Sequence, residues 1–150
     1  MNKSSHSETQ IVNDLTQPSL LVVDDEENFL KLAELVLSRE GYRVVTASDG
    51  IHALACADRE KFRLAILDIK MEPMTGVQVL AELKRRDPTT QVVMVTGYQT
   101  EDTRNECVKL GAAAYLTKPV QMSELKDVLR HLIGADHILQ GNITAHEDKH

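Results

Sequence analysis

Short, unbroken apolar runs alternate with amphipathic stretches along most of the chain. The runs occupy residues 20–23, 44–45, 64–67, 92–95 and 112–116. They are continuous rather than alternating, which is typical of strands that are buried on both faces. The segments between them place apolar residues at i, i+3, i+4 and i+7, the spacing of one helix face. Five strand–helix units in succession predict a parallel sheet with right-handed crossovers and helices on both faces.

The predicted helices set the limits of the folded domain. They span residues 26–40, 49–61, 75–87, 100–110 and 121–133. Gly41 follows the first helix and Pro88 follows the third, as expected for residues that end helices. We therefore expect a domain over residues 19–133. The segments 1–18 and 134–150 lack sustained apolar periodicity, and we expect them to be a flexible N-terminal arm and a flexible C-terminal tail.

Composition narrows the class of protein. A length of 150 residues fits one domain, and 17 Lys and Arg against 23 Asp and Glu give a net charge of −6. The acidic balance argues against direct nucleic-acid binding. The apolar runs are shorter than the roughly 18 residues of a membrane span, and the first 18 residues resemble no secretory signal. Cys56 and Cys107 lie within helical patterns as small core residues, so we expect a cytoplasmic protein without membrane contact.

Polar residues with reactive or ligating side chains follow four of the five apolar runs. Asp24 and Asp25 come directly after the first run, Asp68 follows the third, Thr96 ends the fourth, and Lys118 comes shortly after the fifth. Each residue alone could cap a helix or begin a loop. In an open α/β sheet, however, ligands bind beyond the carboxyl ends of the strands. We therefore expect these side chains to converge at one edge of the sheet.

The chemistry of this set indicates phosphoryl transfer. Carboxylates packed together repel one another, which raises the pKa of at least one of them unless a cation is bound. Oxygen ligands of this kind suit Mg²⁺. The ammonium of Lys118 and the hydroxyl of Thr96 suit a phosphoryl group. A phosphoryl-transfer site needs positioning and charge neutralisation, and a carboxylate can itself accept the group as an aspartyl phosphate.

Several motifs together carry a family resemblance. They are Asp24-Asp25-Glu26 after the first run, Ala47 and Gly50 before the second helix, Asp68 with Gly76 eight residues on, Val95-Thr96-Gly97, and Tyr115 followed by Lys118-Pro119. With these motifs, residues 19–133 resemble the CheY-like receiver domain of two-component response regulators. The resemblance implies a flavodoxin-like (βα)5 three-layer sandwich with strand order 2-1-3-4-5.

The resemblance also assigns roles to the site residues. Asp68 is similar to the phosphoacceptor, giving 4-aspartylphosphate. Asp25, Asp68 and the backbone carbonyl of Lys70 are similar to the Mg²⁺ ligands, and Asp24 would act through a coordinated water. Thr96 and Lys118 would bind phosphoryl oxygens. Tyr115 matches the aromatic switch residue that follows the shift of Thr96, and the Lys118–Pro119 bond would be cis.

Two features depart from the family pattern or vary within it. The loop after the phosphoacceptor usually carries Pro four residues on, often followed by Gly, where this chain has Glu72 and Pro73. The spacing to Gly76 is kept, so we expect a reshaped loop with an intact site. Lys70 and Tyr98 occupy positions two beyond Asp68 and Thr96, which vary in the family and are tied to the lifetime of the phosphate.

The implied function is that of a response regulator in a two-component system or phosphorelay. It would take its phosphoryl group from a sensor histidine kinase or a His-phosphotransfer protein, and would catalyse only its own phosphorylation and slow dephosphorylation. Partner binding would switch at the face formed by residues 100–110, 112–116 and 121–133. The segment after residue 133 is too short for a DNA-binding domain, so we expect a stand-alone regulator. The downstream target and a phosphorylation-dependent dimer stay open.

Two alternatives are weaker. A pseudo-receiver that binds partners without phosphorylation would usually have lost Asp68, Thr96 or Lys118, and all three are present. A phosphatase of the haloacid-dehalogenase type would need a second Asp two residues after the nucleophile, where Lys70 stands. That hypothesis would also leave the Asp24–Asp25 pair without a role.

Overall fold

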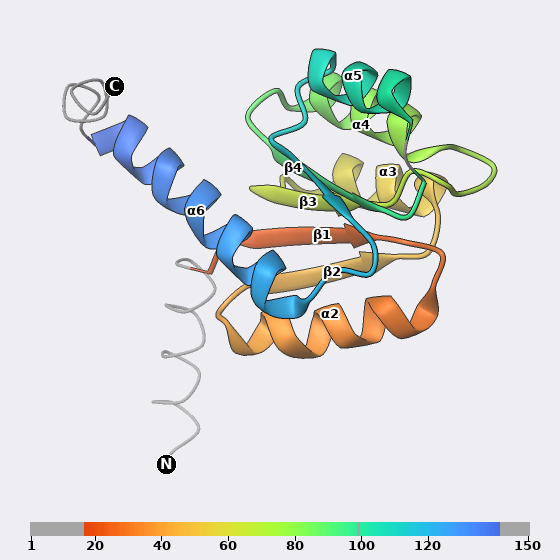
Figure 1. Ribbon diagram of the computed structural model, residues 1–150. Helices are drawn as coiled ribbons and strands as arrows, with labels where there is room; N and C mark the ends of the chain where they lie inside the picture. Colours follow the sequence, from red (N-terminus) through yellow and green to blue (C-terminus); the bar gives the residue numbers. More distant parts are fainter. Residues whose placement is uncertain (1–16, 99, 142–150) are drawn as a thin grey trace.

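Strands and helices alternate from one end of the domain to the other (Figure 1). The structure is a computed structural model and describes residues 17–98 and 100–141. The elements are β1 (Ser19–Val23), α2 (Glu27–Arg39), β2 (Arg43–Ala47), α3 (Gly50–Arg59), β3 (Leu64–Leu67), α4 (Gly76–Arg86), β4 (Gln91–Thr96), α5 (Glu101–Lys109), β5 (Ala114–Thr117) and α6 (Met122–Gly141). They reproduce the five strand–helix units that the apolar pattern predicts.

All five strands form one parallel sheet in the order β2-β1-β3-β4-β5, which confirms the predicted flavodoxin-like fold. The chain moves outward from β1 to β2 and then returns to add β3 on the other side of β1. The strand order therefore switches between β1 and β3, where a ligand site is expected. Val23 pairs with Leu67 in this register, so the residues that follow them, Asp24 and Asp68, emerge side by side.

The core consists of two apolar layers, one on each face of the sheet. Successive side chains of a strand point to opposite faces. Leu21 and Val23 therefore join the layer beneath α3, α4 and α5, whereas Leu20 and Val22 join the layer beneath α2 and α6. Figure 1 shows these two groups of helices on opposite sides of the sheet. This three-layer packing holds the carboxyl ends of the strands at a fixed edge.

The edges of the sheet differ from the sequence-based expectation. The side chains of β1 and β3 are buried along their whole length, as predicted for strands covered on both faces. That prediction is wrong for β2 and β5, whose side chains are mostly half-buried. Both strands lie at an edge of the sheet, where one side has no neighbouring strand.

The last helix is longer than the helix predicted from the sequence. α6 continues past residue 133 to Gly141. The rest of the predicted flexible segments, residues 1–16 and 142–150, lie outside the described residues. Within the described part of the chain, every helix is too short or too polar to cross a bilayer.

The start of α4 fixes the loop that follows β3. The Thr75 side chain accepts a hydrogen bond from the backbone N–H of Gln78, and the Gln78 side chain accepts one from the backbone N–H of Thr75. This reciprocal capping box satisfies two N–H groups at the helix start. The Gly76 N–H donates to the carbonyl of Ile69 at 2.7 Å, which closes the loop directly behind Asp68.

Candidate functional site

Three carboxylates meet at the carboxyl edge of the sheet, as the strand-end pattern predicts. Asp24, Asp25 and Asp68 each place one carboxylate oxygen within 4.8 Å of the others. Asp24 and Asp68 are buried, and Asp25 is exposed. Backbone N–H groups support the buried pair: Glu26 donates to Asp24 Oδ1 at 2.8 Å, and Lys70 donates to Asp68 Oδ1 at 3.4 Å. The cluster joins residues from the ends of β1 and β3.

Lys118 extends into this cluster from the segment after β5. Its Nζ donates to Asp24 Oδ2 at 2.6 Å, to Glu26 Oε1 at 2.6 Å and to Asp68 Oδ2 at 3.5 Å. The backbone N–H of Lys118 donates to the Thr96 carbonyl at 2.9 Å, and the Lys118–Pro119 bond is cis, as predicted. The Lys118 ammonium therefore lies among carboxylates from the segments that follow β1 and β3, at the edge of the sheet where the strand-end pattern predicts it.

The electrostatics of the cluster favour a bound cation. Burial raises the pKa of Asp24, although the hydrogen bonds from Lys118 and the Glu26 N–H act in the opposite direction. Burial alone would lower the pKa of Lys118, but its hydrogen bonds to Asp24 and Glu26 outweigh that effect and raise it, so Lys118 is an ammonium at neutral pH. Asp25 and Asp68 add further oxygen donors beside this pair. A set of hard carboxylate oxygens around a single ammonium fits Mg²⁺.

The remaining site residues lie beside the cluster. Thr96 ends β4, is fully buried, and accepts a hydrogen bond from the backbone N–H of Tyr98 at Oγ1 over 3.0 Å. The Tyr115 hydroxyl donates to the Tyr98 carbonyl at 3.1 Å, and the Arg104 guanidinium lies 5.3 Å from the centroid of the Tyr115 ring. An open cleft is lined by Asp25, Glu26, Asp68, Lys70, Thr96, Gly97, Tyr98 and Lys118. Tyr115 thus contacts the loop beside the cleft rather than lining the cleft.

The loop after β3 carries Glu72 and Pro73, the two residues at which the sequence departs from the family pattern. The Glu72–Pro73 bond is cis. Glu72 is exposed and lines a neighbouring groove with Pro73 and Tyr98. The carboxylate cluster consists of Asp24, Asp25 and Asp68. Three carboxylates therefore come together at the edge of the sheet without Glu72.

A family model described as "Response regulator receiver domain" matches residues 20–130. The chain belongs to this family. The match covers all of the sheet except Ser19, the first residue of β1, and it ends within the first half of α6. Receiver domains are signalling modules of two-component systems rather than conventional enzymes, which removes the phosphatase alternative.

Curated relatives of the receiver domain are longer proteins. The transcriptional regulatory protein ZraR of Klebsiella oxytoca is 33% identical over 128 residues, which cover 85% of this chain and 29% of ZraR. The transcriptional regulatory protein GlrR of Escherichia coli (strain K12) is 39% identical over 106 residues, which cover 71% of this chain and 24% of GlrR. The chain thus spans less than a third of either relative. The absence of direct nucleic-acid binding remains a prediction.

A solved structure has the same fold over almost its entire length. The CheY-like receiver domain protein from Methanospirillum hungatei JF-1 is 31% identical, with a TM-score of 0.77, and the match covers 81% of this chain and 98% of that chain. The likeness agrees with the strand order and the three layers described above.

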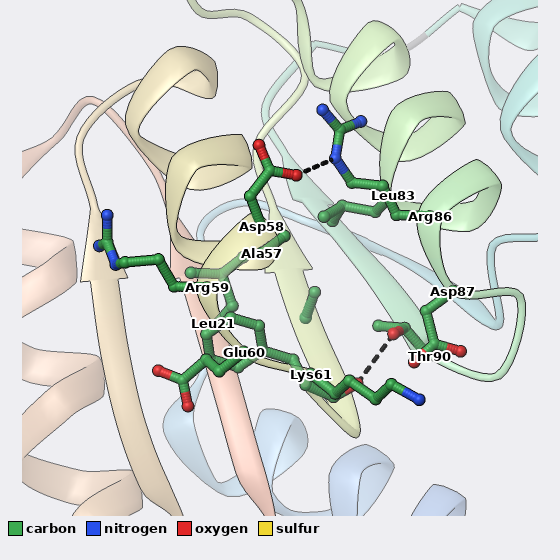
Figure 2. A pocket seen from close by; sticks show the side chains of 12 residues that line it. Leu21, Ala57, Asp58, Arg59, Glu60, Lys61, Leu83, Arg86, Asp87 and Thr90 are labelled. Atoms are coloured by element: carbon green, nitrogen blue, oxygen red, sulfur yellow. Dashed lines mark hydrogen bonds and ion pairs between the residues drawn. The ribbon is translucent and has the colours of Figure 1, made fainter.

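A separate pocket lies at the opposite end of the sheet, between the C-terminal ends of α3 and α4 (Figure 2). Leu21 is part of its apolar lining. Arg86 donates from Nε to Asp58 Oδ1 at 2.8 Å and so links the two helices, and Thr90 Oγ1 donates to the Phe62 carbonyl at 2.8 Å. The rim carries charges of both signs, and the pocket shares no residue with the carboxylate cluster.

The sequence analysis assigns no role to Glu26, which lies in the site of the receiver domain. Glu26 contributes a carboxylate to Lys118 at the same distance as Asp24 does. Its place in the Asp24-Asp25-Glu26 motif was the available signal. The motif alone, however, does not indicate which way the side chain points.

Proposed function

We propose that Asp68 accepts a phosphoryl group from the phosphohistidine of a sensor histidine kinase or a His-phosphotransfer protein. One observation carries this proposal: the buried Asp68 carboxylate has Lys118 Nζ 3.5 Å from its Oδ2, with Asp24 and Asp25 in the same cluster. An isolated strand-end Asp would lack these partners. The arrangement offers a nucleophilic oxygen, a fixed positive charge and oxygen ligands for a metal within one cleft.

The transfer exchanges one bond to phosphorus for another. An Asp68 carboxylate oxygen attacks the phosphorus in line, the P–N bond to the donor histidine breaks, and the imidazole keeps the electron pair. Lys118 stabilises the oxygens of the transferred group, and the Thr96 hydroxyl donates to one of them. Asp25, Asp68 and the Lys70 carbonyl would hold Mg²⁺, with Asp24 acting through a water. The ion would supply the charge that offsets carboxylate repulsion.

The switch would run from Thr96 to Tyr115. In the structure, the Thr96 hydroxyl accepts a hydrogen bond from the Tyr98 N–H, and the Tyr115 hydroxyl donates one to the Tyr98 carbonyl. Movement of Thr96 toward a phosphoryl oxygen would remove the first contact and reposition the loop that anchors Tyr115. The affected surface is formed by α5, β5 and α6, and we assign it to an as yet unidentified downstream protein.

Phosphorylation with a small donor tests the proposal. Incubation with acetyl phosphate and Mg²⁺ should add one phosphoryl group to the wild-type chain, measured by intact-mass spectrometry. Asp68→Asn should remain unmodified because the amide is a poor nucleophile. Asp102→Asn, which alters an exposed carboxylate on α5, is the matched control and should be modified like the wild type. Equal modification of Asp68→Asn and the wild type would contradict the assignment.

Capture experiments would then identify the output. The protein would be immobilised with and without beryllofluoride, which mimics the acyl phosphate on Asp68. A protein retained only in the presence of beryllofluoride is the expected target. Identical capture in both states would argue for a pseudo-receiver that binds partners without phosphorylation.

A further inference from the structure

The side chain of Glu26 does not cap the helix at whose start it lies. Glu26 is the N-cap residue of α2, but its side chain makes no capping hydrogen bond. The N-cap side chains of α3, α4 and α5 (Asp49, Thr75 and Thr100) do accept such bonds. The Glu26 carboxylate instead accepts a hydrogen bond at 2.6 Å from Lys118, which is 92 positions away in the chain.

The contacts of Lys118 differ in how readily they can break. Its Nζ lies 2.6 Å from Asp24 and from Glu26, but 3.5 Å from Asp68. The Asp24 side chain is 1% exposed, whereas that of Glu26 is 63% exposed. Loss of the first contact would leave a buried charge without its partner, which is costly. Loss of the second would leave a carboxylate in water, which costs little.

We infer that Glu26 is a positioning residue that holds the Lys118 ammonium back from Asp68 while Asp68 is unmodified. This inference rests on the proposed function. A phosphoryl group on Asp68 places anionic oxygens beside Nζ, and these compete with Glu26 for the same ammonium. The contact between Glu26 and Lys118 therefore opposes the phosphorylated state, and its removal should favour that state.

Beryllofluoride affinity measures this competition directly. The test titrates beryllofluoride into the full chain at saturating Mg²⁺ by isothermal titration calorimetry. Glu26→Gln removes the charge, and Glu26→Asp keeps the charge but shortens the reach to Lys118 by one methylene. Both variants should bind about fivefold more tightly than the wild type. This factor corresponds to about 1 kcal/mol, the upper end for an exposed ion pair.

The neighbouring Glu27 provides the matched control. It is exposed, lies in the first turn of α2, and Glu27→Gln changes the net charge by the same amount. Its affinity should stay within about twofold of the wild type. Unchanged affinity in both Glu26 variants would overturn the inference, as would equal tightening in Glu27→Gln. If the folded wild type binds no beryllofluoride, the proposed function itself fails and this inference fails with it.

Discussion

The backbone of Asp68 leaves no room for a side chain at Gly76. A Cβ atom on Gly76 would lie 1.9 Å from the carbonyl oxygen of Asp68 and 2.7 Å from the Cα of Ile69. Both neighbours are backbone atoms, so neither can turn away as a flexible side chain would. The first turn of α4 therefore packs directly against the strand end that carries Asp68, the proposed phosphoacceptor.

Gly76→Ala should both destabilise the fold and displace Asp68. Overpacking against rigid backbone costs about 1–3 kcal/mol, and we expect a loss at the upper end of this range. Modification by acetyl phosphate should also slow, because Asp68 must shift. Urea unfolding and intact-mass time courses measure the two effects. Gly134→Ala is the control, since a Cβ there meets nothing within 4 Å. Equal behaviour of the two variants would contradict the prediction.

Mg²⁺ should stabilise the native state by relieving repulsion within the carboxylate cluster. A ligand that binds only the native state at 100 times its Kd adds about 2.7 kcal/mol to the free energy of unfolding. Asp25 is exposed, so Asp25→Ala removes an oxygen donor without opening a core cavity. The rise in melting temperature with Mg²⁺ should largely vanish in Asp25→Ala and persist in Glu27→Ala. A full rise in Asp25→Ala would exclude Asp25 as a ligand.

The two cysteines should react at very different rates. Cys107 is fully buried in the layer beneath α5, and burial, with a smaller contribution from Glu106, raises the pKa of its thiol. Cys56 on α3 is half-buried. Alkylation proceeds through the thiolate, so at pH 8 iodoacetamide should add one group to the native protein, at Cys56. Cys107 should react after unfolding in urea. Peptide mapping that found Cys107 modified first in the native state would contradict its placement.

The positions of Asp24, Asp68 and Thr96 were predictable from the sequence for a physical reason. Each of them ends or directly follows a continuous apolar run, and parallel strands bring their carboxyl ends to one edge of the sheet. The burial of β2 was not predictable in the same way. An apolar pair such as Val44 and Val45 looks alike in a central strand and an edge strand, and the strand order alone decides how much solvent reaches it.

Contacts made by loop residues with distant parts of the chain could not be predicted from the sequence pattern. The Lys118–Glu26 contact joins residues 92 positions apart, and the Tyr115–Tyr98 bond joins residues 17 apart. Periodicity describes which face of a strand or helix is buried, but it carries no information on the direction of a loop side chain. The family resemblance names Lys118 and Tyr115 as functional residues, and the structure adds the groups that hold them: Asp24 and Glu26 for Lys118, and the Tyr98 carbonyl for Tyr115.

The ring of Tyr98 should shield an aspartyl phosphate on Asp68 from water. Tyr98 lines the same cleft as Asp68, and its loop is held by Thr96 and Tyr115. The Lys70 ammonium lies 5.6 Å from the ring centroid, so the two side chains approach each other beside the cleft. Hydrolysis requires a water in line with the bond between phosphorus and the Asp68 oxygen. A bulky ring beside that approach restricts the water.

Tyr98→Ala should therefore lose its phosphoryl group about tenfold faster than the wild type, which corresponds to only about 1.4 kcal/mol of barrier. The measurement is a decay time course of the phosphorylated protein at fixed Mg²⁺. Tyr98→Phe keeps the ring and should decay like the wild type, which separates shielding from any effect of the hydroxyl. The Tyr98 side chain is 44% exposed, so the competing role is contact with a partner. Unchanged or slower decay in Tyr98→Ala would contradict shielding and would favour a role for Tyr98 in contact with a partner.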